Sequence, residues 1–139
     1  MYSTKGTLLK KEIEAILNNA YDLVTVVDGT GHAISASSSL EKYFGIPVSE
    51  YIGTHVRFLE DSNILSKSIA AEILRTKRPQ RLIQDTKNGH RLAVKGVPIF
   101  DDHGSLVRIY NFSKDITEVS YLKNELKETE ELLQIYRTE

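Results

Sequence analysis

The sequence predicts an α+β fold with one five-stranded antiparallel sheet. Three observations carry this prediction: two strand-like segments near the start of the chain, three more in its second half, and several short helical segments between the two groups. The strand-like segments alternate and are rich in β-branched and aromatic residues, and Gly-containing turns separate them. A chain of 139 residues has the length of a single domain with one core.

Residues 1–20 are expected to form an amphipathic helix ahead of the sheet domain. From residue 8 onward, apolar side chains recur at helical spacing and share one face: Leu9, Ile13, Ile16, Leu17 and Ala20. The charged residues of this segment fall elsewhere on the helix. Because the helix is short, it needs a docking partner to be stable.

Two strands and a series of helices come next. The segments 22–28 and 32–37 predict strands, and the Gly-Thr-Gly between them predicts a tight turn. Residues 38–53 predict short helical pieces, because Gly and Pro interrupt them. Residues 66–77 predict a longer helix with Ser66 as its N-cap. Three serines are candidates to cap the first short piece: Ser37, Ser38 and Ser39.

The second half of the chain contains the clearest hairpin. Residues 80–87 and 90–100 flank Asn88-Gly89, a pair that favours a type I′ turn. A last strand is expected at residues 105–113. The chain therefore divides into three parts: the helix 1–20, the sheet domain 21–117 and a C-terminal helix 118–139.

Composition and motifs argue against several classes of function. The formal net charge is −1, from 18 basic and 19 acidic residues, so neither nucleic acid nor an anionic membrane is an expected partner. The chain has no run of about 18 apolar residues, and its lack of cysteine fits a cytoplasmic location. The Gly-Thr-Gly turn lacks the third Gly of a dinucleotide-binding loop, and the four histidines lack metal-ligand spacing. An enzyme is therefore not expected.

Four segments together resemble a PAS domain, over roughly residues 10–137. They are AILNNAYDLVTVVDGTGHAISAS, LEKYFGIPVSEYIG, KNGHRLAVKGVPIFDDHGSLV and the closing DIT. The last two, in this order and spacing, are the specific ones. The chain resembles most closely the sensory PAS domains of bacterial enhancer-binding transcription activators, which work with the alternative sigma factor. Sensor histidine kinases carry similar domains, so the resemblance leaves both classes open.

The resemblance implies a ligand pocket between the sheet and the crossover helices, for a small-molecule metabolite. Side chains alternate between the two faces of a strand. Counting back from the DIT, every second residue of the last strand is therefore expected to face this pocket. Nine residues are candidates to line it: Gln84, Val94, Ile109, Asn111, Ser113, Ile69, Ile73, His55 and Arg57. Many PAS domains have Asn at the start of the first crossover helix, where this chain has SASSSL, so no role that depends on that Asn is carried over.

The amides of Gln84 and Asn111 are informative, because leaving a buried amide unpartnered costs about 1–3 kcal/mol. Either they orient a small polar ligand, or they form a structural hydrogen bond. His55 and Arg57 lie in the crossover, where they either supply charge to an organic anion or belong to a solvated loop.

The sequence does not name a cofactor. A flavin or chromophore linked through cysteine is excluded, because the chain has no Cys. Haem needs an axial ligand on a pocket-facing helix, and among the four histidines only His55 approaches that position, so haem is not expected. A flavin bound without a covalent link is compatible with the sequence, but no residue pattern indicates one.

The C-terminal segment divides into heptads with a mostly apolar seam, which predicts a coiled-coil homodimer. The apolar seam positions are Val119, Leu122, Leu126 and Leu133. Thr129 and Tyr136 weaken the seam, so a small signal from the sheet domain is expected to change the register of the two helices. The alternative is that the segment is a linker stub that does not pair by itself. The segment ends without a stop signal, which predicts that the natural protein continues into an effector such as an ATPase or kinase domain.

Residues Asp115, Ile116, Thr117 and Glu118 join the last strand to this helix. Asp115 is expected to be the N-cap, and Glu118 to complete a D-x-x-E capping box. We expect pocket occupancy to shift the strand and the shift to pass through these four residues into the helix. The alternatives are that Asp115 is only a stabilising cap, and that the whole chain is a structural dimerisation domain with a filled core.

Overall fold

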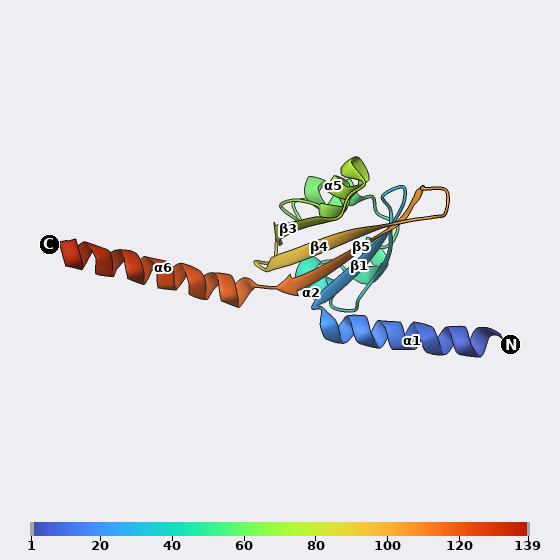
Figure 1. The fold of residues 1–139 in the computed structure, drawn as a ribbon, viewed down its shortest axis with the longest axis horizontal. Coiled ribbons are helices and arrows are strands. Elements are labelled where there is room, and N and C mark those ends of the chain that lie inside the picture. The colour runs from blue at the N-terminus through green and yellow to red at the C-terminus, as the bar shows by residue number, and fades with distance from the viewer. Residues whose placement is uncertain (1, 139) are drawn as a thin grey trace.

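The computed structural model describes residues 2–138, with side chains described for residues 6–137. A five-stranded sheet with short helices packed on it forms the body, and two long helices extend from it in nearly opposite directions (Figure 1). The elements run in the order α1 (Tyr2–Ala20), β1 (Leu23–Asp28), β2 (Ala33–Ala36), α2 (Leu40–Phe44), α3 (Val48–Tyr51), α4 (Val56–Asp61), α5 (Ile69–Thr76), β3 (Gln80–Asp85), β4 (Arg91–Phe100), β5 (Leu106–Asp115) and α6 (Thr117–Thr138). The predicted α+β class is confirmed.

The sheet has the strand order β2-β1-β5-β4-β3, and every neighbouring pair is antiparallel, as predicted. Helices α2 to α5 form the crossover between β2 and β3. The register places residues of different strands in rows across the sheet. One row contains Gly96, Asn111 and Thr25, and the neighbouring row contains Val94 and Ser113. These two rows form the centre of the inner face.

The inner face packs closely against α5. Along β5, Ile109 and Asn111 are buried, and so the inward parity predicted from alternation is confirmed. A Cβ atom at Gly96 would lie 2.4 Å from Ile73 Cδ1 and 3.2 Å from Ile69 Cδ1. Glycine at this position therefore allows α5 to approach β4 more closely than any other residue would.

The two long helices leave their apolar faces uncovered. Helix α1 spans Tyr2–Ala20, within the range predicted for it, and the side chains of Leu9 and Ile16 are 57% and 66% exposed. The docking expected for this face is therefore not made within the described chain. Helix α6 likewise extends beyond the body (Figure 1).

The cap of α5 is Ser68 and not Ser66, which corrects the prediction. The helix begins at Ile69, and the Ser68 hydroxyl accepts a hydrogen bond from the Ala71 N–H at 3.3 Å. The Ser66 hydroxyl instead accepts from the Asp85 N–H at 2.9 Å. Ser66 therefore fastens the crossover to β3, a long-range contact that no local pattern indicates.

The serines before α2 also serve long-range contacts. Ser39 occupies the N-cap position, but its hydroxyl donates to the Asp22 carbonyl at 2.6 Å and caps nothing. The Ser37 hydroxyl accepts from the Val24 N–H at 3.0 Å. Both hydroxyls therefore tie the crossover to the segment around the start of β1, and the predicted side-chain cap by Ser37 or Ser39 is not formed.

Candidate functional site

A small cavity lies between the sheet and the crossover helices. Its volume is about 20 Å³, and one water molecule needs about 10–15 Å³ by the same measure. The cavity therefore has the size of a single water-sized group. The polar residues in its wall come from β1, β3, β5 and the crossover. They are Thr25, Tyr51, Thr54, His55, Ser68, Gln84, Asn111 and Ser113.

Two amides in this wall keep unused hydrogen-bonding capacity. Asn111 is 6% exposed and donates through Nδ2 to Thr25 Oγ1 at 3.1 Å. Its Oδ1 has no hydrogen-bond partner among the described residues. Gln84 is 4% exposed, and within the described part of the chain its side chain makes no hydrogen bond. The two amides therefore do not satisfy each other, and both can bind a polar group in the cavity.

Tyr51 covers the cavity from the crossover side. Burial raises the pKa of Tyr51 to about 12, although a hydrogen bond with Thr25 acts in the opposite direction. The hydroxyl therefore stays neutral at physiological pH. Thr25 joins Tyr51 to Asn111, so the polar wall is one connected network with an open end at Asn111 Oδ1.

The nine predicted pocket residues fall into three groups. Five line the cavity: Ile69, Gln84, Asn111, Ser113 and His55. Three others are buried side chains of the same core: Ile73, Val94 and Ile109. Arg57 is exposed and lies in an outer groove, which corrects the prediction that it reaches the pocket. That any of these residues binds a ligand stays a prediction.

The cavity does not fit a flavin or a haem. Pockets for ligands of drug size or larger enclose about 300 Å³ or more, whereas this cavity encloses about 20 Å³. His55, the one histidine considered as a haem ligand, is the N-cap of α4, and its Nδ1 accepts from the Arg57 N–H at 3.3 Å. One of its two ring nitrogens is therefore already used in capping.

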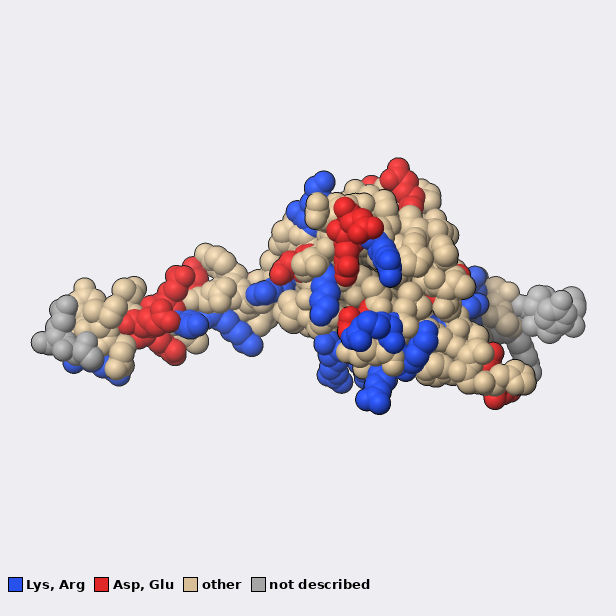
Figure 2. Space-filling view, turned by 90° about the horizontal axis from the view of Figure 1, so that it is seen from above, with Lys and Arg blue, Asp and Glu red and all other residues tan. Residues whose placement is uncertain are grey.

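An open groove of about 930 Å³ lies over α4 and α5, outside the cavity. His55, Val56 and Ser68 line both spaces, so they form the wall between them. On the face seen in Figure 2, many Lys and Arg side chains lie on the rounded body, and Asp and Glu side chains form a band on the projecting α6. Within residues 2–138, no helix combines the length and the apolar composition that crossing a bilayer requires.

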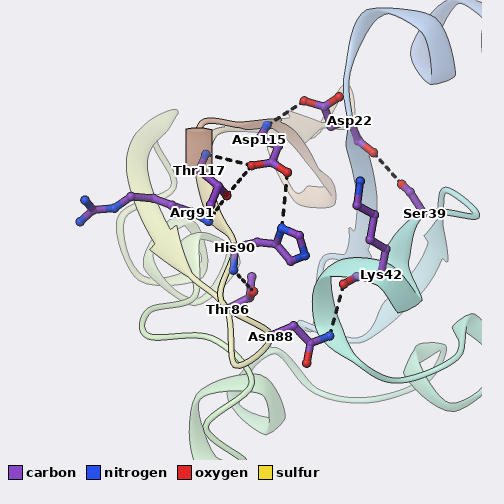
Figure 3. A network of polar contacts seen from close by, with 9 residues as sticks. All are labelled: Asp22, Ser39, Lys42, Thr86, Asn88, His90, Arg91, Asp115 and Thr117. Atoms are coloured by element: carbon purple, nitrogen blue, oxygen red, sulfur yellow. Dashed lines mark hydrogen bonds and ion pairs between the residues drawn. The ribbon is translucent and has the colours of Figure 1, made fainter. Parts of the chain in front are cut away.

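The junction between β5 and α6 gathers polar groups from distant parts of the chain (Figure 3). Asp115 Oδ1 accepts from the Thr117 N–H at 2.9 Å and from the Thr117 hydroxyl at 2.5 Å. The Asp115 N–H donates to Asp22 Oδ2 at 2.7 Å. Arg91 contributes its backbone: its N–H donates to the Thr117 hydroxyl at 2.8 Å, and its carbonyl accepts from the Ile116 N–H at 2.8 Å. The start of α6 is therefore fixed to β4 and to the segment before β1.

The local capping geometry differs from the prediction in two ways. Helix α6 begins at Thr117, so Ile116 is its N-cap residue and Asp115 lies one position earlier. The Asp115 carboxylate still binds the first helical N–H, as an Asx turn. The capping box with Glu118 is not formed, because the Asp115 N–H that Glu118 was expected to bind is taken by Asp22.

The other side of the Asp115 carboxylate faces a histidine and a tyrosine. His90 Nδ1 lies 3.4 Å from Asp115 Oδ2, and the Tyr43 hydroxyl is hydrogen-bonded to Asp115. Burial acts to raise the pKa of Asp115, but the bonds from Thr117 and the nearby His90 and Lys42 outweigh it, so the pKa lies below its usual value. Burial, followed by the Asp115 charge, raises the pKa of Tyr43 to about 12.

Sequence reasoning missed several residues of both sites. Thr25 could have been found from the sequence, because it is the one polar residue inside the apolar run of β1. No sequence pattern could have indicated Asp22, Tyr43 and His90, since they lie in three segments that only the tertiary structure brings together.

The apolar residues of the predicted seam are exposed along α6. The side chains of Val119, Leu122, Leu126 and Leu133 are 51%, 53%, 59% and 49% exposed. Tyr121, outside the seam, is 61% exposed as well. Among the residues whose side chains are described, nothing covers the seam, and the coiled coil stays a prediction.

Comparison with known proteins gives one consistent result. A family model described as a PAS domain matches residues 22–118. No curated protein matches the chain significantly.

Solved structures share the fold at low identity. The PAS domain of an HTR-like protein from Haloarcula marismortui has a TM-score of 0.58 and 14% identity, covering 83% of this chain and 98% of its own. A sensory box sensor histidine kinase from Vibrio cholerae has a TM-score of 0.52 and 11% identity, covering 84% and 98%. An RNA-binding light-oxygen-voltage receptor has a TM-score of 0.57 and 18% identity, and 90% of this chain covers only 38% of that one. These identities establish a shared fold alone.

Proposed function

The chain belongs to the PAS domain family of sensory and signalling domains, and from this we propose that it is the cytoplasmic input module of a bacterial signalling protein. In this proposal the module has no catalysis of its own, and it passes a conformational signal from its core to α6. A transcription regulator is the preferred effector, and a sensor histidine kinase is the other one.

The junction at Asp115 is the observation that carries this proposal. It connects α6 with β4, with the segment before β1 and, through Tyr43, with α2. A displacement of β5 relative to these neighbours has to break or move bonds at the first turn of α6. Ligand binding can shift such an equilibrium only by its preference for one of the two states.

The proposed ligand is a small uncharged polar molecule that binds Gln84 and Asn111. Both amides line the cavity, and Asn111 Oδ1 has no hydrogen-bond partner among the described residues. Because the cavity measures only about 20 Å³, a ligand larger than water has to lift α5 from the sheet. That movement starts at Ile69 and Ile73, which pack against Gly96.

We further propose that α6 pairs with α6 of a second copy. The absence of cysteine from the chain makes this directly testable, because one introduced Cys is the sole thiol. Leu126→Cys lies on the seam and is expected to form a disulfide-linked dimer on mild oxidation. Lys127→Cys, one residue away and off the seam, is the matched control and is expected to crosslink several-fold less. Equal crosslinking of the two variants would exclude the seam.

Ligand binding is tested by native mass spectrometry and by thermal shift against small uncharged metabolites. A ligand at 100 times its Kd stabilises the protein by about 2.7 kcal/mol. We expect a hit to stabilise the wild type and not Asn111→Leu, and to change the Leu126→Cys crosslinking rate. A hit that leaves crosslinking along α6 unchanged would argue against signal transfer.

The size of the cavity favours a second candidate, a structural dimerisation domain with a filled core. A volume of about 20 Å³ suits one buried water that bridges Gln84 and Asn111. On this alternative no metabolite stabilises the wild type, while the α6 dimer still forms.

A further inference from the structure

The side chain of His90 lies between α2 and the junction. Its ring meets the Tyr43 ring edge-on, with centroids 5.0 Å apart at 74°. Its Nδ1 lies 3.4 Å from Asp115 Oδ2, and the side chains of His90 and Asp115 are 24% and 23% exposed. His90 is therefore held against a carboxylate that is largely removed from solvent, and it is the histidine drawn in the junction network (Figure 3).

The β3–β4 hairpin fixes the position of His90. Its backbone N–H donates to Thr86 Oγ1 at 3.1 Å, and its carbonyl accepts from the Thr86 N–H at 2.9 Å. At the tip of the turn, Asn88 Nδ2 donates to the Lys42 carbonyl at 3.2 Å, which attaches the hairpin to α2. The ring is thus positioned by two elements that do not belong to β5.

The two oxygens of Asp115 serve different partners. Oδ1 binds the N–H and the hydroxyl of Thr117, at the start of α6. Oδ2 faces His90. A proton on His90 therefore changes the hold on the same carboxylate that fixes the first turn of α6.

Charged and titratable groups face this site from every neighbouring element. They are Lys42 and Tyr43 from α2, Asp22 from the segment before β1, Asp115 from β5, and Glu118 and Tyr121 from α6. Tyr43 stays neutral, because its pKa is raised to about 12. The pKa of Asp115 is lowered, so it is ionised in the whole range where an imidazole ordinarily titrates. At this site Asp22, Asp115 and Glu118 carry negative charge and Lys42 carries positive charge.

We propose that His90 is a positioning residue of the junction, which makes the attachment of α6 to the sheet dependent on pH. The protonated ring forms an ion pair with Asp115 Oδ2, 3.4 Å away, and holds the carboxylate against Thr117. The neutral ring carries no charge and holds it more weakly. The first turn of α6 therefore opens more readily as pH rises through the titration of His90. This inference rests on the proposed role of the junction in signal transfer.

The test measures opening of the first turn of α6 in the whole chain. Amide exchange of Ser120, whose N–H donates to the Ile116 carbonyl at 2.8 Å, is followed by NMR and corrected for the pH dependence of the chemical step. We expect the opening constant of the wild type to rise about fivefold between about pH 5.5 and about pH 8, the upper end of the effect of losing one partly exposed ion pair. In His90→Gln the opening constant is expected to be independent of pH.

His103→Gln is the matched control, because His103 is exposed in the β4–β5 turn. This variant is expected to keep the wild-type response to pH. A second readout needs no variant: the amide shifts of Ile116 and Thr117 are expected to titrate with the same midpoint as the His90 ring. A different midpoint, or a wild-type pH response in His90→Gln, would overturn the proposal.

Asp115→Asn separates this inference from the proposed function. If that variant raises the opening constant of the first turn of α6 while His90→Gln behaves as the wild type, His90 has no positioning role. The proposed role of the junction in signal transfer is then kept. If Asp115→Asn leaves α6 unchanged, the junction itself does not control the helix, and both proposals fail.

Discussion

The junction at Asp115 and the cavity under α5 are both polar sites on one sheet, but they differ in how their hydrogen bonds are completed. At the junction, the Asp115 carboxylate and its N–H bind Thr117 and Asp22. In the cavity, Asn111 Oδ1 has no partner among the described residues. A completed network favours one geometry, whereas an incomplete one retains binding capacity at a cost in stability.

This difference predicts opposite responses to mutation. Removing a group from the completed junction leaves other buried groups without partners, which is costly. Removing the Asn111 amide from the cavity deletes an oxygen that was already unsatisfied and loses one hydrogen bond, which costs less. The four predictions below test this contrast.

Asp115→Ala is expected to have the largest effect on stability. It removes the acceptor for both bonds from Thr117 and leaves His90 and Tyr43 without their shared partner. We expect the free energy of unfolding to fall by about 2–3 kcal/mol, measured by chemical denaturation. Asp85→Ala is the control, because Asp85 forms an exposed ion pair with Arg91 and its loss should cost less than about 1 kcal/mol. Equal losses would contradict the special role of Asp115.

Gly96→Ala is expected to destabilise the core by about 2 kcal/mol through overpacking. The new Cβ would meet Ile73 Cδ1 at 2.4 Å and Asn111 Oδ1 at 3.1 Å, so α5 has to move away from β4. Gly6→Ala is the control, because a Cβ there has no neighbour within 4 Å. Denaturation curves compare the two variants, and a Gly96→Ala protein as stable as the wild type would show that α5 yields without cost.

Acid pH is expected to remove the contribution of Asp115. Because the folded pKa of Asp115 is below its usual value, its ionised form stabilises the fold above the unfolded pKa, and this stabilisation is lost as pH falls through the folded pKa. In a His90→Gln background, which removes the response to pH proposed for His90, the difference in stability between the protein with Asp115 and its Asp115→Asn variant should therefore be constant above about pH 5 and shrink below about pH 4. Denaturation at several pH values measures it; a difference that persists at the lowest pH would contradict an ionised Asp115.

Asn111→Leu is expected to have the smallest effect. It removes the unpartnered Oδ1 and loses only the bond to Thr25, while the new side chain is similar in volume and apolar. We expect the free energy of unfolding to change by less than about 1 kcal/mol. Thermal unfolding measures it, and a loss as large as that of Asp115→Ala would mean that Asn111 completes a structural network instead of a binding site.

Much of the fold could be predicted because it follows from local pattern. Alternation along β5 predicted that Asn111 and Ser113 face inward, and Asn88-Gly89 predicted the hairpin. The caps were predicted less well, because Ser66 and Ser39 bind distant backbone groups instead of their own helices. A side chain with one hydroxyl serves whichever partner the tertiary fold brings closest.

The sequence by itself determined the strands, their inward faces and the apolar seam of α6, because side-chain period and turn chemistry are local properties. Only the tertiary structure decided the size of the cavity and the partners of Asp115. The first depends on how far Gly96 lets α5 approach β4. The second depends on Asp22, which lies 93 residues away along the chain and takes the N–H that the local pattern reserved for Glu118. Competition between near and distant partners is settled by packing, and packing is known only once the chain is folded.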